Sequence, residues 1–200
     1  MNSLRQQARV VPDPRVVTRV LETGLTAAAN VVGTLARHRE LSDRLAALYQ
    51  YLVFDGTTPR REREIVILRA AWVCRSEYVF GQHTLYGADA GLTDEEVVGT
   101  TQPPFEHAWS TDDRTLLSLA DELLSTWTIT EPTWAGLAAR WSDDQIIELA
   151  TCALGYAMVS GLANGLGVER DDGVPGFPCV LATAEGAGPL SNKENSGHED

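Results

Sequence analysis

The fold is decided by residues 61–90, which read REREIVILRAAWVCRSEYVFGQHTLYGADA. Apolar residues dominate from Ile65 to Val73, in a segment whose Arg, Glu, Leu and Ala residues favour helix over strand. Ser76 is a suitable N-cap for a second helix, because a serine oxygen can accept a hydrogen bond from a free N–H of the first turn. The stretch therefore predicts a helical hairpin, with helices over residues 61–74 and 77–90.

Helical patterns also dominate on both sides of this hairpin. Residues 40–54 place leucines at steps of three and four, which is the spacing of one helical stripe. Thr93 and Glu96 form a capping-box pattern that predicts a short helix over 94–99. Further helices are predicted from Thr111 or Asp112 to about residue 127, over 131–140, and from the cap Ser142 to about residue 162. We therefore expect an all-α protein.

The chain divides into one domain and two ends. Residues 1–12 are expected to be an N-terminal arm, residues 13–170 a helical domain, and residues 171–200 an extended or disordered C-terminal tail. The tail prediction depends on composition, because large apolar side chains become rare in this part of the sequence.

Composition excludes several classes of function. The net charge is −12, which disfavours general binding to nucleic acid, since that needs a basic surface. No long apolar run or signal peptide is evident, so no membrane partner and a cytoplasmic location are expected. The single lysine, Lys193, lies near the C-terminus, which argues against Schiff-base chemistry and a P-loop. We expect no cofactor.

Metal and disulfide sites are also not expected. The three cysteines, Cys74, Cys152 and Cys179, are far apart and odd in number, which argues against a disulfide framework or a zinc site. The four histidines, His83 among them, do not occur in pairs at the spacing that metal ligands usually have.

Glu64 and His83 are the residues most suited to chemistry. They are nineteen positions apart across the expected turn, and an antiparallel hairpin could bring them together. A carboxylate on an apolar helix face needs a partner. Glu64 could orient or protonate the His83 imidazole in an acid–base pair. The two residues could equally form a structural pair that holds the helices together.

The order of these residues resembles the carboxymuconolactone decarboxylase and AhpD-like family. The matching features are Glu64 in an apolar helix, Ser76-Glu77-Tyr78 at the start of the next, His83, and the exit AGLTDEE at 90–96. Segments 109–117, 120–123 and 156–168 also resemble its long-form members. This resemblance implies an AhpD-like helical bundle built around a helical hairpin, which assembles as a trimer or a hexamer and binds a small-molecule substrate.

The sequence departs from the thiol-active relatives at two positions. In those relatives a CxxC pair opens the second helix, and its second cysteine stands four residues before the histidine. Ser76 and Val79 occupy these positions here. Cys74 could be a lone thiol near the site, although it could also be a packing residue.

Several other residues are candidates for substrate binding. Glu77, Tyr78 and Gln82 stand on the second helix, and each could instead have a structural role. His107, on a proline-rich loop, could cover a pocket or simply be exposed. Arg69 or Arg75 could hold a substrate carboxylate, or both could be surface residues. Tyr156 and Asn164 are interpreted as packing residues.

Three functions remain open from sequence. The first is a cofactor-free lyase or isomerase that uses acid–base catalysis on a small carboxylated or lactone-like substrate. The second is an AhpD-like thiol antioxidant protein, which the missing CxxC pair disfavours. The third is a non-catalytic, oligomeric binding protein that has kept the fold without the chemistry.

Overall fold

The computed structural model of the chain describes residues 8–23 and 28–178, and every regular element in these ranges is helical. The all-α prediction is therefore confirmed for this part of the chain. In chain order the elements are α1 (Pro14–Glu22), α2 (Ala29–Leu35), α3 (Arg39–Gln50), the π-helix η1 (Tyr51–Asp55), α4 (Arg60–Val73), α5 (Glu77–Asp89), α6 (Asp94–Gly99), α7 (Thr111–Thr126), α8 (Glu131–Arg140) and α9 (Asp143–Leu166).

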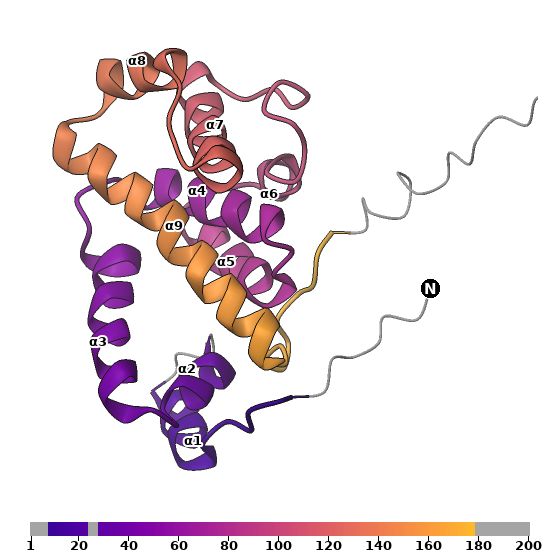
Figure 1. Ribbon diagram of the computed structural model, residues 1–200. Helices are drawn as coiled ribbons and strands as arrows, with labels where there is room; N and C mark the ends of the chain where they lie inside the picture. The colour runs from indigo at the N-terminus through magenta and orange to yellow at the C-terminus, as the bar shows by residue number, and fades with distance from the viewer. Residues whose placement is uncertain (1–7, 24–27, 179–200) are drawn as a thin grey trace, which may run out of the picture.

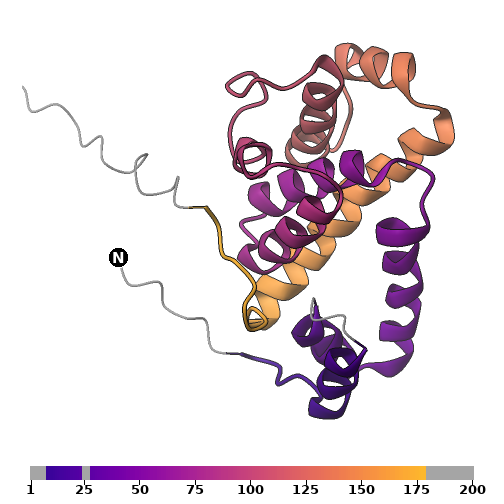
Figure 2. The same cartoon turned by 180° about the vertical axis from the view of Figure 1, so that it is seen from behind.

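Helix α4 lies at the centre of the molecule. Every residue from Arg63 to Ala71 is buried, as expected for a helix that is covered on all sides. Its neighbours are α5, α7 and α9, and α9 crosses the bundle diagonally in both ribbon views (Figures 1 and 2). The predicted hairpin thus forms the core of the fold.

Helix α9 is the longest element and the second contributor to the core. By length and composition alone it could cross a membrane, but half of its apolar window is buried inside the protein. Its buried residues include Leu149, Cys152, Ala153 and Tyr156, which belong to the same hydrophobic core as α4. Helix α9 is therefore explained as a core helix of the bundle.

The helix starts agree with the capping signals in the sequence. The Ser76 side chain accepts a hydrogen bond from the Val79 N–H, and the Thr93–Glu96 capping box is complete. Ser142 caps α9 as expected, but α9 continues past the predicted end to Leu166, where Gly167 adopts a left-handed conformation. The helix predicted over 40–54 is α-helical only to Gln50 and then widens into η1.

Helices α1 and α2 were not predicted from the sequence. The α1 start carries a recognisable signal, because the Asp13 side chain accepts a hydrogen bond from the Arg15 N–H and Pro14 occupies the first turn. Figures 1 and 2 show α1 and α2 at one end of the molecule, joined to the bundle by α3, which stands apart from α4 and α5. Helix α3 itself has no buried residue.

The described parts of both chain ends contact the helical body. In the predicted N-terminal arm, the Arg9 guanidinium donates to the Gly165 carbonyl at 3.0 Å. Residues 171–178, in the predicted tail, pack onto the bundle, and the Phe177 ring lies 5.1 Å from Trp72 and 5.2 Å from Phe80 between centroids. Residues 1–7 and 179–200 lie outside the described part of the chain, and with them Cys179 and the end of the predicted tail.

Candidate active site

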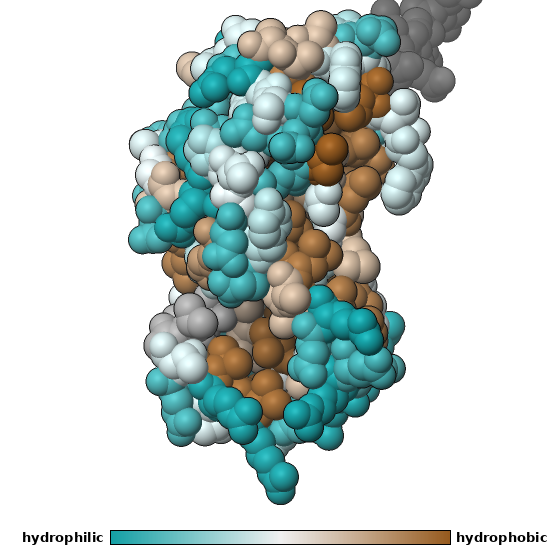
Figure 3. Space-filling model, turned by 90° about the vertical axis from the view of Figure 1, so that its left-hand side faces the viewer, coloured by the Kyte–Doolittle hydropathy of each residue, from teal (hydrophilic) through white to brown (hydrophobic). Residues whose placement is uncertain are grey.

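The space between α3 and the bundle contains a cavity of ≈ 400 Å³. Its walls come from α1, α2, α3, η1, α5 and α9, and are mostly apolar. Apolar residues also gather in a hollow on the side of the molecule that carries α3 (Figure 3). The polar residues of the lining are Arg19, Thr23, Ser42, Tyr49, Gln50, Tyr78, Gln82, His83, Tyr86 and Tyr156. A mostly apolar cavity with a few polar groups is typical of a small-molecule site.

Glu64 and His83 meet at the wall of this cavity. The Nδ1 atom of His83 lies 2.7 Å from Oε2 of Glu64, and both side chains are buried. His83 lines the cavity, whereas Glu64 lies behind it on α4. Because Nδ1 of His83 is occupied by its contact with Glu64, Nε2 is the ring nitrogen that remains available to a ligand. The hairpin therefore brings the two residues together, as the sequence predicted.

Two tyrosines pack against the His83 imidazole. The ring centroid of Tyr156 lies 4.5 Å from that of His83, and that of Tyr86 lies 5.4 Å away. Burial, followed by the negative charge of Glu64, raises the pKa of both tyrosines above the ordinary value, and the pKa of Tyr156 most strongly. Both phenols therefore stay protonated at neutral pH and can donate hydrogen bonds to a ligand.

Tyr78 and Gln82 are joined through a residue outside the predicted site. The Tyr78 hydroxyl and the Gln82 Nε2 group each donate to Oδ2 of Asp171 at 2.7 Å. Burial raises the pKa of the Asp171 carboxyl, although the hydrogen bonds from Tyr78, Asn30 and Gln82 oppose this. Tyr78 and Gln82 both line the cavity, so these two predicted binding residues lie beside His83.

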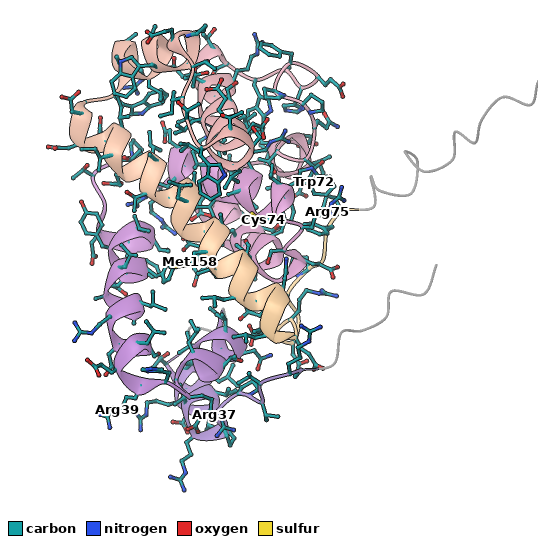
Figure 4. All side chains as sticks on the ribbon, in the orientation of Figure 1. Arg37, Arg39, Trp72, Cys74, Arg75 and Met158 are labelled. Atoms are coloured by element: carbon teal, nitrogen blue, oxygen red, sulfur yellow. The ribbon has the colours of Figure 1, made fainter. Side chains whose placement is uncertain are left out.

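Cys74 lies outside the described lining of the cavity. It is found with Trp72 and Arg75 at the turn between α4 and α5 (Figure 4). Burial raises the pKa of its thiol, which disfavours the reactive thiolate at neutral pH. Cys152 is fully buried, and burial raises its pKa to about 12. Neither thiol has the environment of an activated cysteine.

Glu77 and His107 also lie away from the cavity lining. The Glu77 carboxylate is 3.8 Å from the Arg170 guanidinium and faces a separate, polar surface depression. The His107 ring packs against Trp109, with centroids 4.9 Å apart. The structure therefore brings together Glu64, His83, Tyr78 and Gln82, but it does not bring Cys74, Glu77 or His107 to the same place.

The interpretation of Arg69 as a surface residue or a substrate clamp is wrong. Arg69 is buried, and its guanidinium forms a bidentate pair with Asp121, at 2.6 and 2.8 Å. It also donates to the carbonyls of Thr100 and Gln102. These contacts occupy the guanidinium N–H groups of Arg69 within the fold. Arg69 therefore cannot form a second bidentate pair with a substrate carboxylate. Arg75 lies at the polar depression and does not line the cavity.

Sequence reasoning missed part of the site. Tyr156 was assigned to packing, yet it lines the cavity beside His83. Its position on a long apolar helix gave no sign of this, because core and cavity residues share one helical face. The part of the cavity wall formed by α1 and α2 was also missed, because these two helices were not predicted. Arg19 on α1 is the one cationic residue that the described part of the chain contributes to the lining.

The family comparison agrees with this architecture. Residues 39–101 match the model of the Carboxymuconolactone decarboxylase family. This range includes α3, the α4–α5 hairpin and both Glu64 and His83. No curated protein matches the chain.

Solved structures with the same fold are distant in sequence. An uncharacterized peroxidase-related protein with an alkylhydroperoxidase AhpD core, from Ralstonia eutropha JMP134, superposes with a TM-score of 0.68 at 18% identity, covering 80% of this chain and 87% of that chain. A peroxidase-related protein from Silicibacter sp. TM1040 gives 0.69 at 15%, covering 82% and 89%. The debrominase Bmp8, as a cysteine-to-alanine variant with 2,3,4-tribromopyrrole, gives 0.68 at 14%, covering 86% and 94%.

Proposed function

This chain is a member of the carboxymuconolactone decarboxylase and AhpD-like family, and on that premise we propose that it is a cofactor-free lyase or isomerase acting by acid–base catalysis. The substrate is a small carboxylated or lactone-like molecule. The observation that carries the proposal is the 2.7 Å contact between Glu64 and His83 at the wall of an apolar cavity. A histidine oriented by a carboxylate is a common arrangement for moving protons.

In the proposed reaction each residue has a distinct part. Glu64 binds Nδ1 and holds the imidazole in the tautomer that presents Nε2 to the substrate. If Nε2 removes a proton next to a carbonyl, the Glu64 carboxylate stabilises the imidazolium that forms. If the substrate instead loses carbon dioxide, the electron pair stays on the substrate as an enolate, and protonated Nε2 supplies the proton to carbon.

The cavity supplies the remaining requirements of such chemistry. The protonated Tyr156 and Tyr86 phenols can donate hydrogen bonds to an enolate oxygen. Arg19 on α1 offers a cationic partner for a carboxylate at the cavity. The apolar walls limit water around the reacting atoms, which strengthens these electrostatic contacts.

Thiol chemistry is the weaker alternative. The positions where thiol-active relatives carry their cysteine pair hold Ser76 and Val79, and Ser76 caps α5. Cys74 has a raised pKa and stands outside the cavity lining. The peroxidase-related and debrominase descriptions of the structural relatives therefore do not carry over to this chain.

A substrate panel tests the proposal. We expect the wild-type protein to convert at least one member of a set of small β-keto acids and unsaturated lactones, followed by carbon dioxide release and absorbance. His83→Gln removes the proton-transfer nitrogen and should lower kcat at least about 100-fold. Glu64→Gln should also lower kcat, because the ring loses its orienting charge.

A second variant separates the alternatives. Cys74→Ser with Cys179→Ser removes the thiols other than buried Cys152 and should leave turnover unchanged. Turnover that survives His83→Gln but is lost in the cysteine variant would support thiol chemistry and overturn the proposal. Ligand binding without any turnover across the panel would favour the non-catalytic binding protein.

A further inference from the structure

The hydroxyl group of Tyr156 differs from those of other cavity tyrosines in its hydrogen bonding. The Tyr49 hydroxyl donates to the Gly155 carbonyl at 2.9 Å, and the Tyr78 hydroxyl donates to Asp171 at 2.7 Å. The Tyr156 hydroxyl, in contrast, has no hydrogen-bond partner within the described part of the chain. The fold therefore leaves the hydrogen-bonding capacity of this group unused.

The Tyr156 hydroxyl and the Nε2 atom of His83 are both accessible from the cavity. Tyr156 is 5% exposed and His83 is 4% exposed. Packing seals several unpartnered polar atoms off completely, the amide oxygen of Gln82 among them, but it does not seal either of these two atoms. Both residues line the cavity, and neither lines the polar depression. The accessible surface of the two atoms therefore belongs to the cavity.

Tyr86 also contacts the His83 ring, but it is less enclosed than Tyr156. Its side chain is half-buried, so water can satisfy its hydroxyl group. Its ring centroid lies 5.4 Å from that of His83, whereas the Tyr156 centroid lies 4.5 Å away at an interplanar angle of 81°. An unsatisfied hydroxyl is costly only where it is buried. Tyr156 is therefore the tyrosine that gains most from a ligand.

The two accessible atoms offer a ligand opposite hydrogen-bonding roles. Burial, followed by the charge of Glu64, holds the pKa of Tyr156 well above its ordinary value, so the phenol is a donor. Nε2 of His83 is an acceptor when Nδ1 carries the proton that it donates to Glu64. A carbonyl compound suits both atoms, because its oxygen accepts from the phenol while a C–H group on the neighbouring carbon faces the base.

The walls around these two atoms suit a ring. The Tyr86 ring lies beside His83, and the Phe54 ring packs edge-on against Tyr86 with centroids 6.1 Å apart. Aromatic side chains make favourable contacts with another planar ring. The cavity volume of ≈ 400 Å³ is enough for a bicyclic molecule.

We propose that Tyr156 is a catalytic residue for proton transfer at carbon, and that the substrates are ring-bearing, enolisable carbonyl compounds. This deepens the proposed function and rests on it for His83 as the base. Nε2 removes the proton next to the carbonyl, and the electron pair of the broken C–H bond moves to the oxygen. The resulting enolate accepts a hydrogen bond from Tyr156. The imidazolium then returns the proton to the same or a conjugated carbon, so the net reaction is an isomerisation.

Hydrogen exchange at carbon tests the proposal without the natural substrate. 2-Tetralone is a bicyclic ketone whose α-protons are replaced by deuterium in D₂O, and proton NMR measures the rate. We expect the wild-type protein to accelerate this exchange above the buffer rate. Tyr156→Phe should lower the rate constant due to the protein roughly 100-fold, as the loss of one donor to an enolate oxygen implies. No acceleration by the wild-type protein, or an unchanged rate in Tyr156→Phe, would overturn the proposal.

Binding of an enol analogue separates this proposal from the proposed function. 2-Naphthol has the planar ring and the oxygen of the 2-tetralone enol without being a ketone. Tyr156→Phe should weaken its binding roughly tenfold in a fluorescence titration, because one hydrogen bond is lost, and an unchanged affinity would overturn the role of the hydroxyl. If exchange survives His83→Gln but not Tyr156→Phe, the proposed base is wrong while the tyrosine donor stands.

Tyr51→Phe is the matched control. Tyr51 is 45% exposed and does not line the cavity, so the same substitution there should leave both exchange and 2-naphthol binding unchanged. Because the Tyr156 hydroxyl has no partner in the fold, Tyr156→Phe should unfold at the wild-type temperature or above it, which excludes misfolding as the cause of a lost activity. A loss of exchange of equal size in Tyr51→Phe would overturn the assignment to Tyr156.

Discussion

At Gly81 the absence of a side chain lets residues after α9 lie directly on α5. A Cβ atom at this position would meet the backbone carbonyl of Pro175 and the side chain of Val174. Backbone cannot move aside as a flexible side chain can, so Gly81→Ala should displace this segment or strain it. We expect a loss of about 1 to 3 kcal/mol in the free energy of unfolding, measured by urea denaturation.

Gly161 provides the matched control for this substitution. It lies in α9, is exposed, and a Cβ atom there would meet no atom within 4 Å. Gly161→Ala should therefore stabilise the protein by roughly 0.5 to 1 kcal/mol, since alanine favours helix over glycine. If both substitutions had the same effect, close packing at Gly81 would not be the cause.

Individual residues of the site were predictable to different degrees. The pairing of Glu64 with His83 followed from their spacing across a hairpin, because a buried carboxylate needs a partner and the turn fixes the register. Asp171 could not be predicted, since its position depends on how an irregular segment folds back over α5. Cys74 is close to the site in sequence, but it is the C-cap residue of α4 and is not among the lining residues.

Among the elements, α4 carries three buried charged residues, and each contacts a different neighbour. Glu64 pairs with α5 through His83, Arg69 with α7 through Asp121, and Arg63 with α9 through Glu148. The last pair also anchors the turn before α4, because Glu148 accepts from the N–H groups of Thr57 and Thr58. These contacts fix the rotation of α4 and thus the direction of Glu64.

The Glu148 contact predicts a pH-dependent contribution to stability. Burial alone would raise the pKa of Glu148, but hydrogen bonds from Thr58 and Thr57 outweigh it and lower the pKa. A carboxyl group with a lowered pKa stabilises the folded protein above its unfolded-state pKa and loses this contribution as the pH falls through the folded-state value. Glu148→Gln should cost roughly 3 kcal/mol at neutral pH, since it leaves Arg63 buried without its partner charge.

Denaturation at several pH values checks this prediction. The difference between wild type and Glu148→Gln should be full at neutral pH and should shrink below about pH 4, where the unfolded-state glutamate becomes protonated. Glu40→Gln is the control, because the Glu40–Arg44 pair is exposed and contributes little. A difference that stays constant with pH would contradict the assigned role of the Glu148 charge.

The elements themselves were largely predictable where caps and periodicity agree. Ser76, Thr93 and Ser142 each marked a helix start correctly. The widening of α3 into η1 has no clear sequence signal, because it depends on how Leu52 and Val53 reach the core after a helix with no buried residue. Tertiary packing decides such a change of register.

For the molecule as a whole, the exposed apolar residues of α3 remain to be explained. Leu41 is 46% exposed and Leu48 37%, and Tyr51 and Phe54 of η1 are exposed as well. Other residues of α3, such as Leu45 and Tyr49, line the cavity, as does Phe54. Apolar side chains gathered in this way are typical of an interface. We propose that this surface joins copies of the chain in the trimer or hexamer implied by the family.

Light scattering after size-exclusion chromatography tests this assembly. The wild-type protein should have a mass corresponding to three or six chains, and Leu41→Glu with Leu48→Glu should reduce it to the single-chain mass of 21.7 kDa, because charges in an apolar interface are strongly unfavourable. Phe105→Glu is the control: Phe105 is 79% exposed in the loop between α6 and α7, so the mass should not change. A wild-type monomer would exclude the interface, and the outer wall of the cavity would then consist of α3 alone.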